Sequence, residues 1–124
     1  TFRGTGTRLK EFNPKVKLIS VQPDSPMHGL EGMKHMESAI VPGIYDPGLA
    51  DENVFVSTED AQDTVIRAAR EEGLLIGVSG GAALAASLKL GHRLAENGES
   101  AVIVTLLPDS GERYLGERFW EGRA

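Results

Sequence analysis

The chain has 124 residues, about the size of one domain, and 40% of them are apolar, which excludes wholesale disorder. Its net charge of −5, without any basic run, argues against a nucleic-acid-binding protein. The absence of cysteine excludes a disulfide framework, a thiolate nucleophile and a cysteine zinc site, and it fits a reducing compartment such as the cytoplasm. The longest uncharged stretch, residues 73–88, is too short to span a membrane.

The first half of the chain alternates short predicted elements with turn sequences. Residues 5–13 are expected to form a helix, because apolar residues lie three apart and Pro14 ends the pattern. The β-branched residues 16–21 indicate a strand. Residues 27–40 are ambiguous and could hold a short helix, whereas residues 41–48 contain two prolines and two glycines and are expected to form a loop.

The second half has clearer boundaries. A short strand over residues 53–56 leads to Ser57, whose hydroxyl can cap a helix that continues to Glu72. Gly73 is suited to the position just after that helix, and the acidic residues at its start suit the positive end of the helix dipole.

Two apolar runs, residues 74–78 and 101–107, are typical of strands buried on both faces. A helix from about residue 81 to 96 separates them. Strand–helix–strand units of this length favour right-handed parallel crossovers. The predicted fold class is therefore α/β, a parallel sheet flanked by helices, with residues 1–124 forming a single domain.

The junction at residues 77–81 is the best candidate for a functional site. Its glycines let a ligand approach the backbone, the helix start leaves N–H groups unpaired, and Ser79 offers a hydroxyl. An alternative is a tight turn in which Ser79 only caps the helix. The junction also spells the G-x-S-x-G of α/β-hydrolases, but His92 precedes Asp109 in the chain, which is the wrong order for a catalytic triad of that fold.

Three residues with helical spacing, His28, Glu31 and His35, are candidate metal ligands. Gly29 and Gly32 weaken such a helix, and the spacing matches no ordinary zinc signature. A solvated polar face is favoured, and no metal is expected.

A polar segment that starts with Pro108 follows the last predicted strand. In a parallel sheet, the carboxyl end of that strand faces the same crevice as Ser79. The alternative is a solvated loop with a surface pair between Glu112 and Arg113. Two polar segments at one edge of a sheet favour a site there.

Five short motifs occur along the chain: Val21-Gln22-Pro23, Pro42-Gly43-Ile44, Glu72-Gly73-Leu74, Gly77-Val78-Ser79-Gly80-Gly81-Ala82-Ala83 and Ser110-Gly111-Glu112-Arg113-Tyr114-Leu115. In this order they resemble the pyridoxal-phosphate-dependent cysteine synthases, or O-acetylserine sulfhydrylases. These are fold type II enzymes, in the same superfamily as cystathionine β-synthase and threonine dehydratase. The resemblance runs over nearly the whole chain.

The resemblance implies pyridoxal 5′-phosphate as cofactor. By the same resemblance, Ser79 would hydrogen-bond the pyridine nitrogen and Pro108 would lie near the ring. Thr1 would correspond to the last threonine of the phosphate-binding loop, and Gly43 and Ile44 would line the substrate side. A neutral hydroxyl at the ring nitrogen suits β-elimination and replacement better than transamination.

The resemblance covers only the C-terminal part of such an enzyme. The chain also lacks an initiator methionine and a visible signal peptide, so we expect it to begin inside a longer reading frame or after processing. In the family the lysine that forms the Schiff base precedes this segment, and no lysine of this chain matches it. No catalytic residue is therefore assigned, and the chain alone is expected to be inactive.

The predicted function is the C-terminal segment of a cytoplasmic cysteine synthase that replaces the acetate of O-acetylserine by sulfide and forms a homodimer when complete. The expected partner is thus the missing N-terminal part of the same enzyme. Binding to nucleic acid or to a membrane is not expected. The alternatives are a related activity, such as cystathionine β-synthase or serine or threonine dehydratase, and a non-catalytic binding or assembly module. Two positions depart from the family: Gly80 stands where a second serine is usual, and Asp109 where serine is more common.

Overall fold

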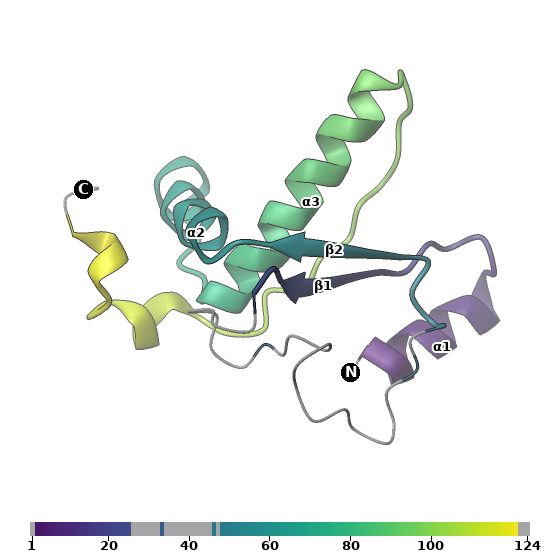
Figure 1. Ribbon diagram of the computed structural model, residues 1–124, viewed down its shortest axis with the longest axis horizontal. Coiled ribbons are helices and arrows are strands. Elements are labelled where there is room, and N and C mark those ends of the chain that lie inside the picture. Colours follow the sequence, from purple (N-terminus) through teal and green to yellow (C-terminus); the bar gives the residue numbers. More distant parts are fainter. Residues whose placement is uncertain (1, 26–32, 34–45, 47, 122–124) are drawn as a thin grey trace.

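The computed structural model describes residues 2–25, 33, 46 and 48–121. Helices and short 3-10 turns surround a pair of strands in this part of the chain (Figure 1). The elements are α1 (Phe2–Phe12), β1 (Ile19–Pro23), β2 (Glu52–Val56), α2 (Thr58–Glu72), α3 (Val78–Glu96), η1 (Gly111–Tyr114) and η2 (Arg118–Trp120).

The strands β1 and β2 form a parallel pair in which Ile19 lies opposite Glu52 and Pro23 lies opposite Val56. The first strand is therefore shifted from the expected residues 16–21, because pairing with β2 starts only at Ile19. Helix α3 packs against both strands and crosses them in Figure 1.

Helix α1 is attached where the two strands begin. It starts three residues earlier than expected. A carboxylate oxygen of Asp51, just before β2, accepts hydrogen bonds from Lys10 Nζ on α1 and from the N–H of Leu18, just before β1, both at 2.7 Å. The last turn of α1 is thus joined to the amino ends of both strands.

Helix α2 confirms the predicted boundaries. Ser57 is its N-cap, and the Ser57 hydroxyl accepts a hydrogen bond from the N–H of Asp60 at 3.0 Å. Gly73 follows the helix with φ of 67°, a left-handed conformation that favours glycine, and its N–H donates to the carbonyl of Ala68. The local sequence alone determines both ends.

Helices α2 and α3 pack closely because Gly81 has no side chain. A Cβ at that position would lie 2.5 Å from the carbonyl oxygen of Ala61 and 2.5 Å from a methyl carbon of Val65, both on α2. The small residues at the start of α3 therefore allow the close contact between α2 and α3. The buried core residues are Val56, Ala61, Val78, Ala82, Ala85, Ala86 and Tyr114, with Val65, Ala68 and Ile76 in a second cluster.

The prediction of a strand over residues 74–78 is wrong. Leu74 and Leu75 are exposed, and Val78 already belongs to α3. What remains is one antiparallel bridge between Ile76 and Ser110. Among the described residues, the ladder pairing of this segment is thus limited to this one bridge and the two backbone hydrogen bonds beside it.

The prediction of a buried strand over residues 101–107 is also wrong. This segment is irregular, and the side chains of Val102 and Val104 are 92% and 86% exposed. A strand needs a neighbour for its N–H and C=O groups, and the residues described here place no strand beside this segment. The burial predicted from its apolar sequence is therefore absent from this structure as well.

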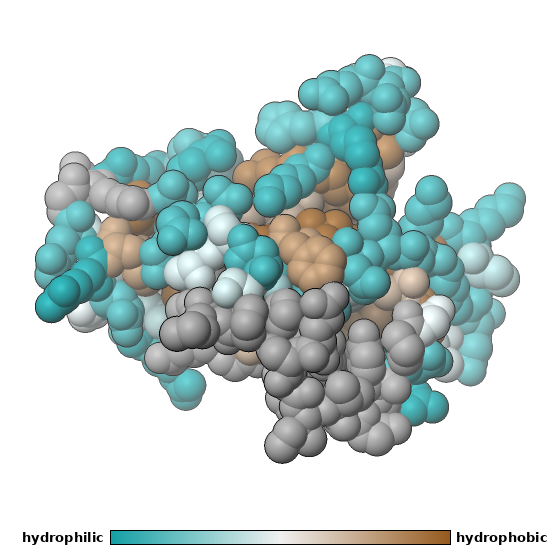
Figure 2. All heavy atoms as spheres, in the orientation of Figure 1, coloured by the Kyte–Doolittle hydropathy of each residue, from teal (hydrophilic) through white to brown (hydrophobic). Residues whose placement is uncertain are grey.

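Apolar side chains accordingly remain at the surface. Figure 2 shows them around the centre of the molecule, where β2 crosses α3. Phe55 on β2 is 45% exposed, and Leu106 in the irregular segment is 64% exposed. Within the described ranges, no helix is long and apolar enough to cross a membrane.

Two of the expectations fall on residues that the structure leaves undescribed. The ambiguous region 27–40 lies outside the described residues apart from Met33, as does most of the expected loop 41–48. Of that loop, Asp46 and Gly48 are described, and a carboxylate oxygen of Asp46 accepts from the N–H of Gly48 at 2.9 Å. This is the local bonding of an Asx turn. The single domain over residues 1–124 stays a prediction.

Candidate functional site at the N-terminus of α3

Two segments far apart in the sequence lie side by side at the start of α3. The N–H of Gly77 donates to the carbonyl of Asp109 at 3.2 Å, and the N–H of Gly111 donates to the carbonyl of Leu75 at 3.0 Å. The bridge between Ile76 and Ser110 lies between these two bonds. The structure thus brings the polar segment after Pro108 to the same place as the glycine-rich junction.

Ser79 lies in the first turn of α3 and is not its N-cap. The N-cap is Gly77, which has no side chain, so the alternative reading of Ser79 as a simple cap is wrong. The Ser79 side chain is half-buried and makes no hydrogen bond within the described part of the chain. By contrast, Ser87 on the same helix donates to the carbonyl of Ala83 at 2.8 Å. The hydroxyl of Ser79 is therefore available to a ligand.

The carboxylate of Asp109 lies against the N-cap of α3. A Cβ at Gly77 would overlap this carboxylate, so the two positions fit only when residue 77 is glycine. The hydroxyl of Tyr114 donates to Asp109 Oδ2 at 3.0 Å. Asp109 Oδ1 is buried and has no hydrogen-bond partner in the described chain. The site thus combines a free hydroxyl with an incompletely satisfied carboxylate.

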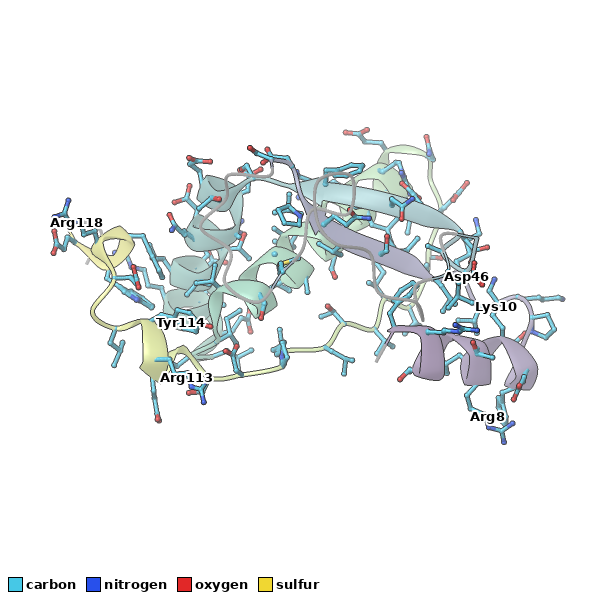
Figure 3. All side chains as sticks on the ribbon, turned by 60° about the horizontal axis from the view of Figure 1, so that its bottom comes forward. Arg8, Lys10, Asp46, Arg113, Tyr114 and Arg118 are labelled. Carbon is cyan, nitrogen blue, oxygen red and sulfur yellow. The ribbon has the colours of Figure 1, made fainter. Side chains whose placement is uncertain are left out.

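The turn that carries Tyr114 is itself held by several bonds. The indole N–H of Trp120 donates to the carbonyl of Tyr114 at 2.9 Å. The hydroxyl of Ser110 accepts from the N–H of Glu112 at 3.2 Å and caps η1. Figure 3 shows Tyr114 directed toward the helices, whereas Arg113 points away from them. Pro108 is exposed at the start of the same turn.

Other expected site residues cannot be placed. Thr1, Gly43 and Ile44 lie outside the described residues. The same holds for the candidate metal ligands His28, Glu31 and His35. Over the ranges that are described, no three metal-ligating side chains come together.

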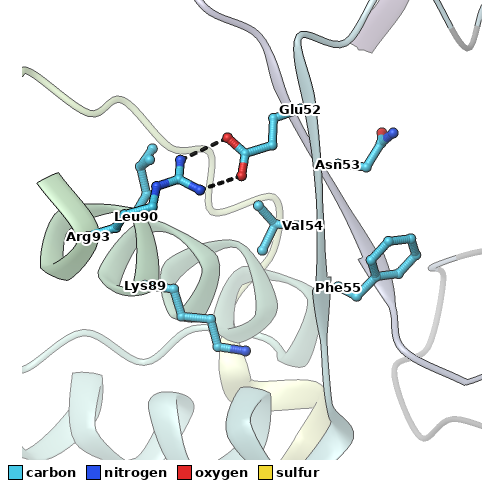
Figure 4. A pocket seen from close by; sticks show the side chains of 7 residues that line it. All are labelled: Glu52, Asn53, Val54, Phe55, Lys89, Leu90 and Arg93. Carbon is cyan, nitrogen blue, oxygen red and sulfur yellow. Dashed lines mark hydrogen bonds and ion pairs between the residues drawn. The ribbon is translucent and has the colours of Figure 1, made fainter.

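A concave region lies between β2 and the C-terminal half of α3 (Figure 4). Its volume is about 450 Å³ and its charged groups are paired with other side chains. Arg93 donates two hydrogen bonds to the carboxylate of Glu52, at 2.6 and 2.8 Å, and Lys89 forms an ion pair with Asp60 at 3.4 Å. The hydrogen bond from Arg93 lowers the pKa of Glu52, and the same bond raises the pKa of Arg93.

This pocket is not the site predicted from the sequence. Its α3 residues start at Lys89, ten positions beyond Ser79, which is about 15 Å along a helix. The pair of Glu52 and Arg93 could not be predicted from the sequence, because the two residues are 41 positions apart. Because its charged side chains are already paired, we interpret this pocket as a structural contact. The candidate for ligand binding is Ser79.

The residues at the start of α3 fit a cofactor with a heteroaromatic nitrogen. The free hydroxyl of Ser79 can hydrogen-bond such a nitrogen, and Gly80 and Gly81 place no side chain beside it. A Cβ at Gly80 would make only ordinary contacts, the nearest at 3.4 Å from Leu107. A Cβ at this position would thus face Leu107 and Ile76.

Comparisons with known proteins also indicate a cofactor-dependent enzyme. Residues 1–109 match the family described as "Pyridoxal-phosphate dependent enzyme". The chain is 50% identical to a cysteine synthase of Aquifex aeolicus over 115 residues, covering 93% of this chain and 35% of that protein. It is 42% identical to an O-acetylserine dependent cystathionine beta-synthase of Bacillus subtilis over 127 residues, covering 98% of this chain and 40% of that protein.

A solved structure supports the same relationship. O-acetyl serine sulfhydrylase isoform 3 from Entamoeba histolytica superposes with a TM-score of 0.84 at 32% identity, over 97% of this chain and 37% of that one. The chain thus spans 35–40% of the length of the curated relatives named above, and it matches their C-terminal portion. Its parallel strands and flanking helices are part of the fold type II architecture. The chain belongs to the pyridoxal-phosphate-dependent enzyme family.

Proposed function

We propose that this chain is the C-terminal part of a pyridoxal-phosphate-dependent cysteine synthase that replaces the acetate of O-acetylserine by sulfide. The observation that carries the proposal is the hydroxyl of Ser79, half-buried in the first turn of α3 and without a partner in the described chain. The 50% identity to the Aquifex aeolicus enzyme favours this activity over others of the family. We place the enzyme in the cytoplasm, as a homodimer completed by the N-terminal part that the relatives possess.

Ser79 has the central role in this proposal. When bound, pyridoxal phosphate withdraws electrons from the α-carbon of the amino-acid substrate, which allows a group on the β-carbon to leave. The Ser79 hydroxyl would donate a hydrogen bond to the ring nitrogen. Because this hydroxyl is neutral, it would not hold a proton on the nitrogen as a carboxylate would, which suits replacement at the β-carbon.

The other assignments follow from the same placement. Pro108, exposed at the carboxyl end of the irregular segment, would lie beside the ring. Thr1 would contact the phosphate, and Gly43 and Ile44 would line the substrate side. The lysine that anchors the cofactor would come from outside this chain.

A chimera tests the proposed activity. In it, this chain replaces the C-terminal portion that it matches in the Aquifex aeolicus cysteine synthase. We expect the chimera to bind pyridoxal phosphate and to form cysteine from O-acetylserine and sulfide. The host protein without its C-terminal portion, and this chain alone, are expected to form none. A chimera that binds the cofactor but makes no cysteine would contradict the proposal.

Substitution of Ser79 in the same chimera separates three roles. If Ser79 contacts the ring nitrogen, Ser79→Ala keeps the cofactor but slows loss of acetate, and Ser79→Asp shifts the cofactor absorbance. If Ser79 is a nucleophile, the wild type forms a covalent adduct with a serine-directed acylating reagent and the alanine variant does not. Native absorbance together with native turnover in Ser79→Ala would show that Ser79 does not contact the cofactor.

A second function is supported by the Bacillus subtilis relative, an O-acetylserine dependent cystathionine beta-synthase at 42% identity. The two activities share the first half of the reaction and differ in the sulfur nucleophile. Comparing sulfide with homocysteine as second substrate of the chimera distinguishes them. We expect a higher kcat/KM with sulfide, and a higher value with homocysteine would assign the second activity.

A further inference from the structure

The proposed function gives no role to the carboxyl group of Asp109, which lies at the candidate site. Its Oδ1 is buried and lacks a hydrogen-bond partner among the described residues, although its Oδ2 accepts from the hydroxyl of Tyr114 at 3.0 Å. The same carboxylate occupies the space that a side chain at Gly77 would need. Buried polar groups are normally hydrogen-bonded, so a buried carboxyl oxygen without a partner needs an explanation.

The start of α3 lacks what the start of α2 has. In α2, the Ser57 hydroxyl caps the helix, and Glu59 and Asp60 place negative charge in the first turn. In α3 the N-cap Gly77 offers no side-chain hydrogen bond, and the first turn holds no acidic residue. The positive end of the α3 dipole therefore has no compensation from its own sequence.

Asp109 brings its carboxyl group beside this helix start from a distant segment. The carbonyl of Asp109 accepts from the N–H of Gly77 at 3.2 Å, so the residue is fixed to the helix start by its backbone as well. Tyr114 is buried on η1 and holds the carboxylate from the other side. Figure 3 shows Tyr114 on the turn that runs beneath the helices.

We propose that Asp109 is a positioning residue: held by Tyr114, its carboxylate fixes the segment after Pro108 against the first turn of α3 and thereby sets the direction of the Ser79 hydroxyl. This inference rests on the proposed function for the role of Ser79, but not for the contact between Asp109 and α3. It also explains why residue 77 is glycine, since a larger residue would displace the carboxylate.

The contact is tested on the full chain without cofactor. Hydrogen exchange followed by mass spectrometry reports on residues 77–81, with residues 58–72 of α2 as internal reference. We expect Asp109→Ala to speed exchange of residues 77–81 at least tenfold relative to α2. Asp109→Asn, which still accepts from Tyr114 but has no charge, should lie between the wild type and the alanine variant. Glu112→Gln, an exposed change on the same turn, is the matched control and should have no effect.

Two results would overturn the contact: unchanged exchange of residues 77–81 in Asp109→Ala, or an equal acceleration of α2, which would indicate general destabilisation. Should the alanine variant fail to fold, Tyr114→Phe keeps the ring and removes the hydroxyl that donates to Asp109. It is expected to speed exchange of residues 77–81 selectively, and no change in this variant would count equally against the proposal.

The action through Ser79 is tested in the chimera loaded with pyridoxal phosphate. We expect Asp109→Ala to shift the cofactor absorbance in the same direction as Ser79→Ala, whereas Glu112→Gln leaves it unchanged. Faster exchange of residues 77–81 without a shift in absorbance would overturn the action through Ser79. A wild-type chimera that binds no cofactor would refute the proposed function, while the exchange data would still decide whether Asp109 holds α3.

Discussion

Two regions differ in how they pair backbone groups and bury apolar side chains. One is the pair of helices α2 and α3, and the other is the segment that follows them, residues 99–108. In the helices, each N–H beyond the first turn finds a carbonyl four residues earlier, and the small residues of α3 pack against Ala61 and Val65 of α2. In the following segment, Val102 and Val104 are almost fully exposed. Helices can therefore form from local sequence, whereas an apolar extended segment depends on a neighbour from elsewhere.

The largest loss of stability should come from a change at the close contact between α2 and α3. Gly81→Val would place atoms within 2.5 Å of the Ala61 carbonyl oxygen, so we expect a loss of about 3 kcal/mol in the free energy of unfolding, measured by urea denaturation. Gly4→Ala in α1 is the control, because a Cβ there meets nothing within 4 Å. This control should leave stability unchanged or raise it. Equal losses for both variants would show that the close approach of α2 and α3 is not what Gly81 provides.

A medium loss of stability is expected when valine is replaced by alanine in the helices, but not in residues 99–108. Val65 is fully buried and Val102 is 92% exposed. Val65→Ala should lower the free energy of unfolding by about 2 kcal/mol, and Val102→Ala should change it by less than about 0.5 kcal/mol. A comparable loss for Val102→Ala would mean that residues 99–108 are buried in the isolated chain, and the contrast would fail.

A smaller effect compares two serines at helix starts. Ser57→Ala removes the hydroxyl that accepts from the Asp60 N–H, so thermal unfolding should report a loss of about 1 kcal/mol. Ser79→Ala should leave the free energy of unfolding nearly unchanged, because its hydroxyl makes no hydrogen bond in the described chain. A loss of the same size at Ser79 would identify it as a cap and would weaken its assignment to a ligand.

The smallest effect concerns the contact between β2 and α3. Hydrogen bonding from Arg93 lowers the pKa of Glu52 from its ordinary value of 4.5. The folded state therefore binds fewer protons, and this contribution to stability is present above pH 4.5 and is lost as the pH falls below it. Glu52→Gln should flatten the pH dependence of the unfolding free energy below pH 5. Arg93→Gln should have the same effect, and an unchanged slope in that variant would exclude the pair as its cause.

How far the sequence predicts the fold follows from the same contrast. The limits of α2 were predictable because Ser57 and Gly73 act within one turn of their own positions. The strand predicted over residues 16–21 was shifted, since its pairing depends on β2, more than thirty residues away. The strands predicted over residues 74–78 and 101–107 were wrong, since nothing local to them indicates whether a neighbouring strand exists.

The candidate site also has a part that the sequence predicts and a part that it does not. Ser79 could be singled out from its glycine-rich surroundings and from the family motif. The fit of Asp109 to Gly77 could not, because the two residues are more than thirty positions apart. The hydrogen bond from Tyr114 to Asp109 spans only five positions, but no local motif indicates it. A motif identifies the residue that would meet the ligand, whereas the groups that hold it emerge only from packing.

Hydrogen exchange of residues 101–107 tests most directly the central claim, that this chain is the C-terminal part of a larger α/β enzyme. We expect this segment to exchange rapidly in the monomeric chain, where its valines are exposed, and slowly in the chimera with the Aquifex aeolicus protein, where strands of the host would pair with it. Rapid exchange in a chimera that makes cysteine, or slow exchange already in the monomeric chain, would contradict the account.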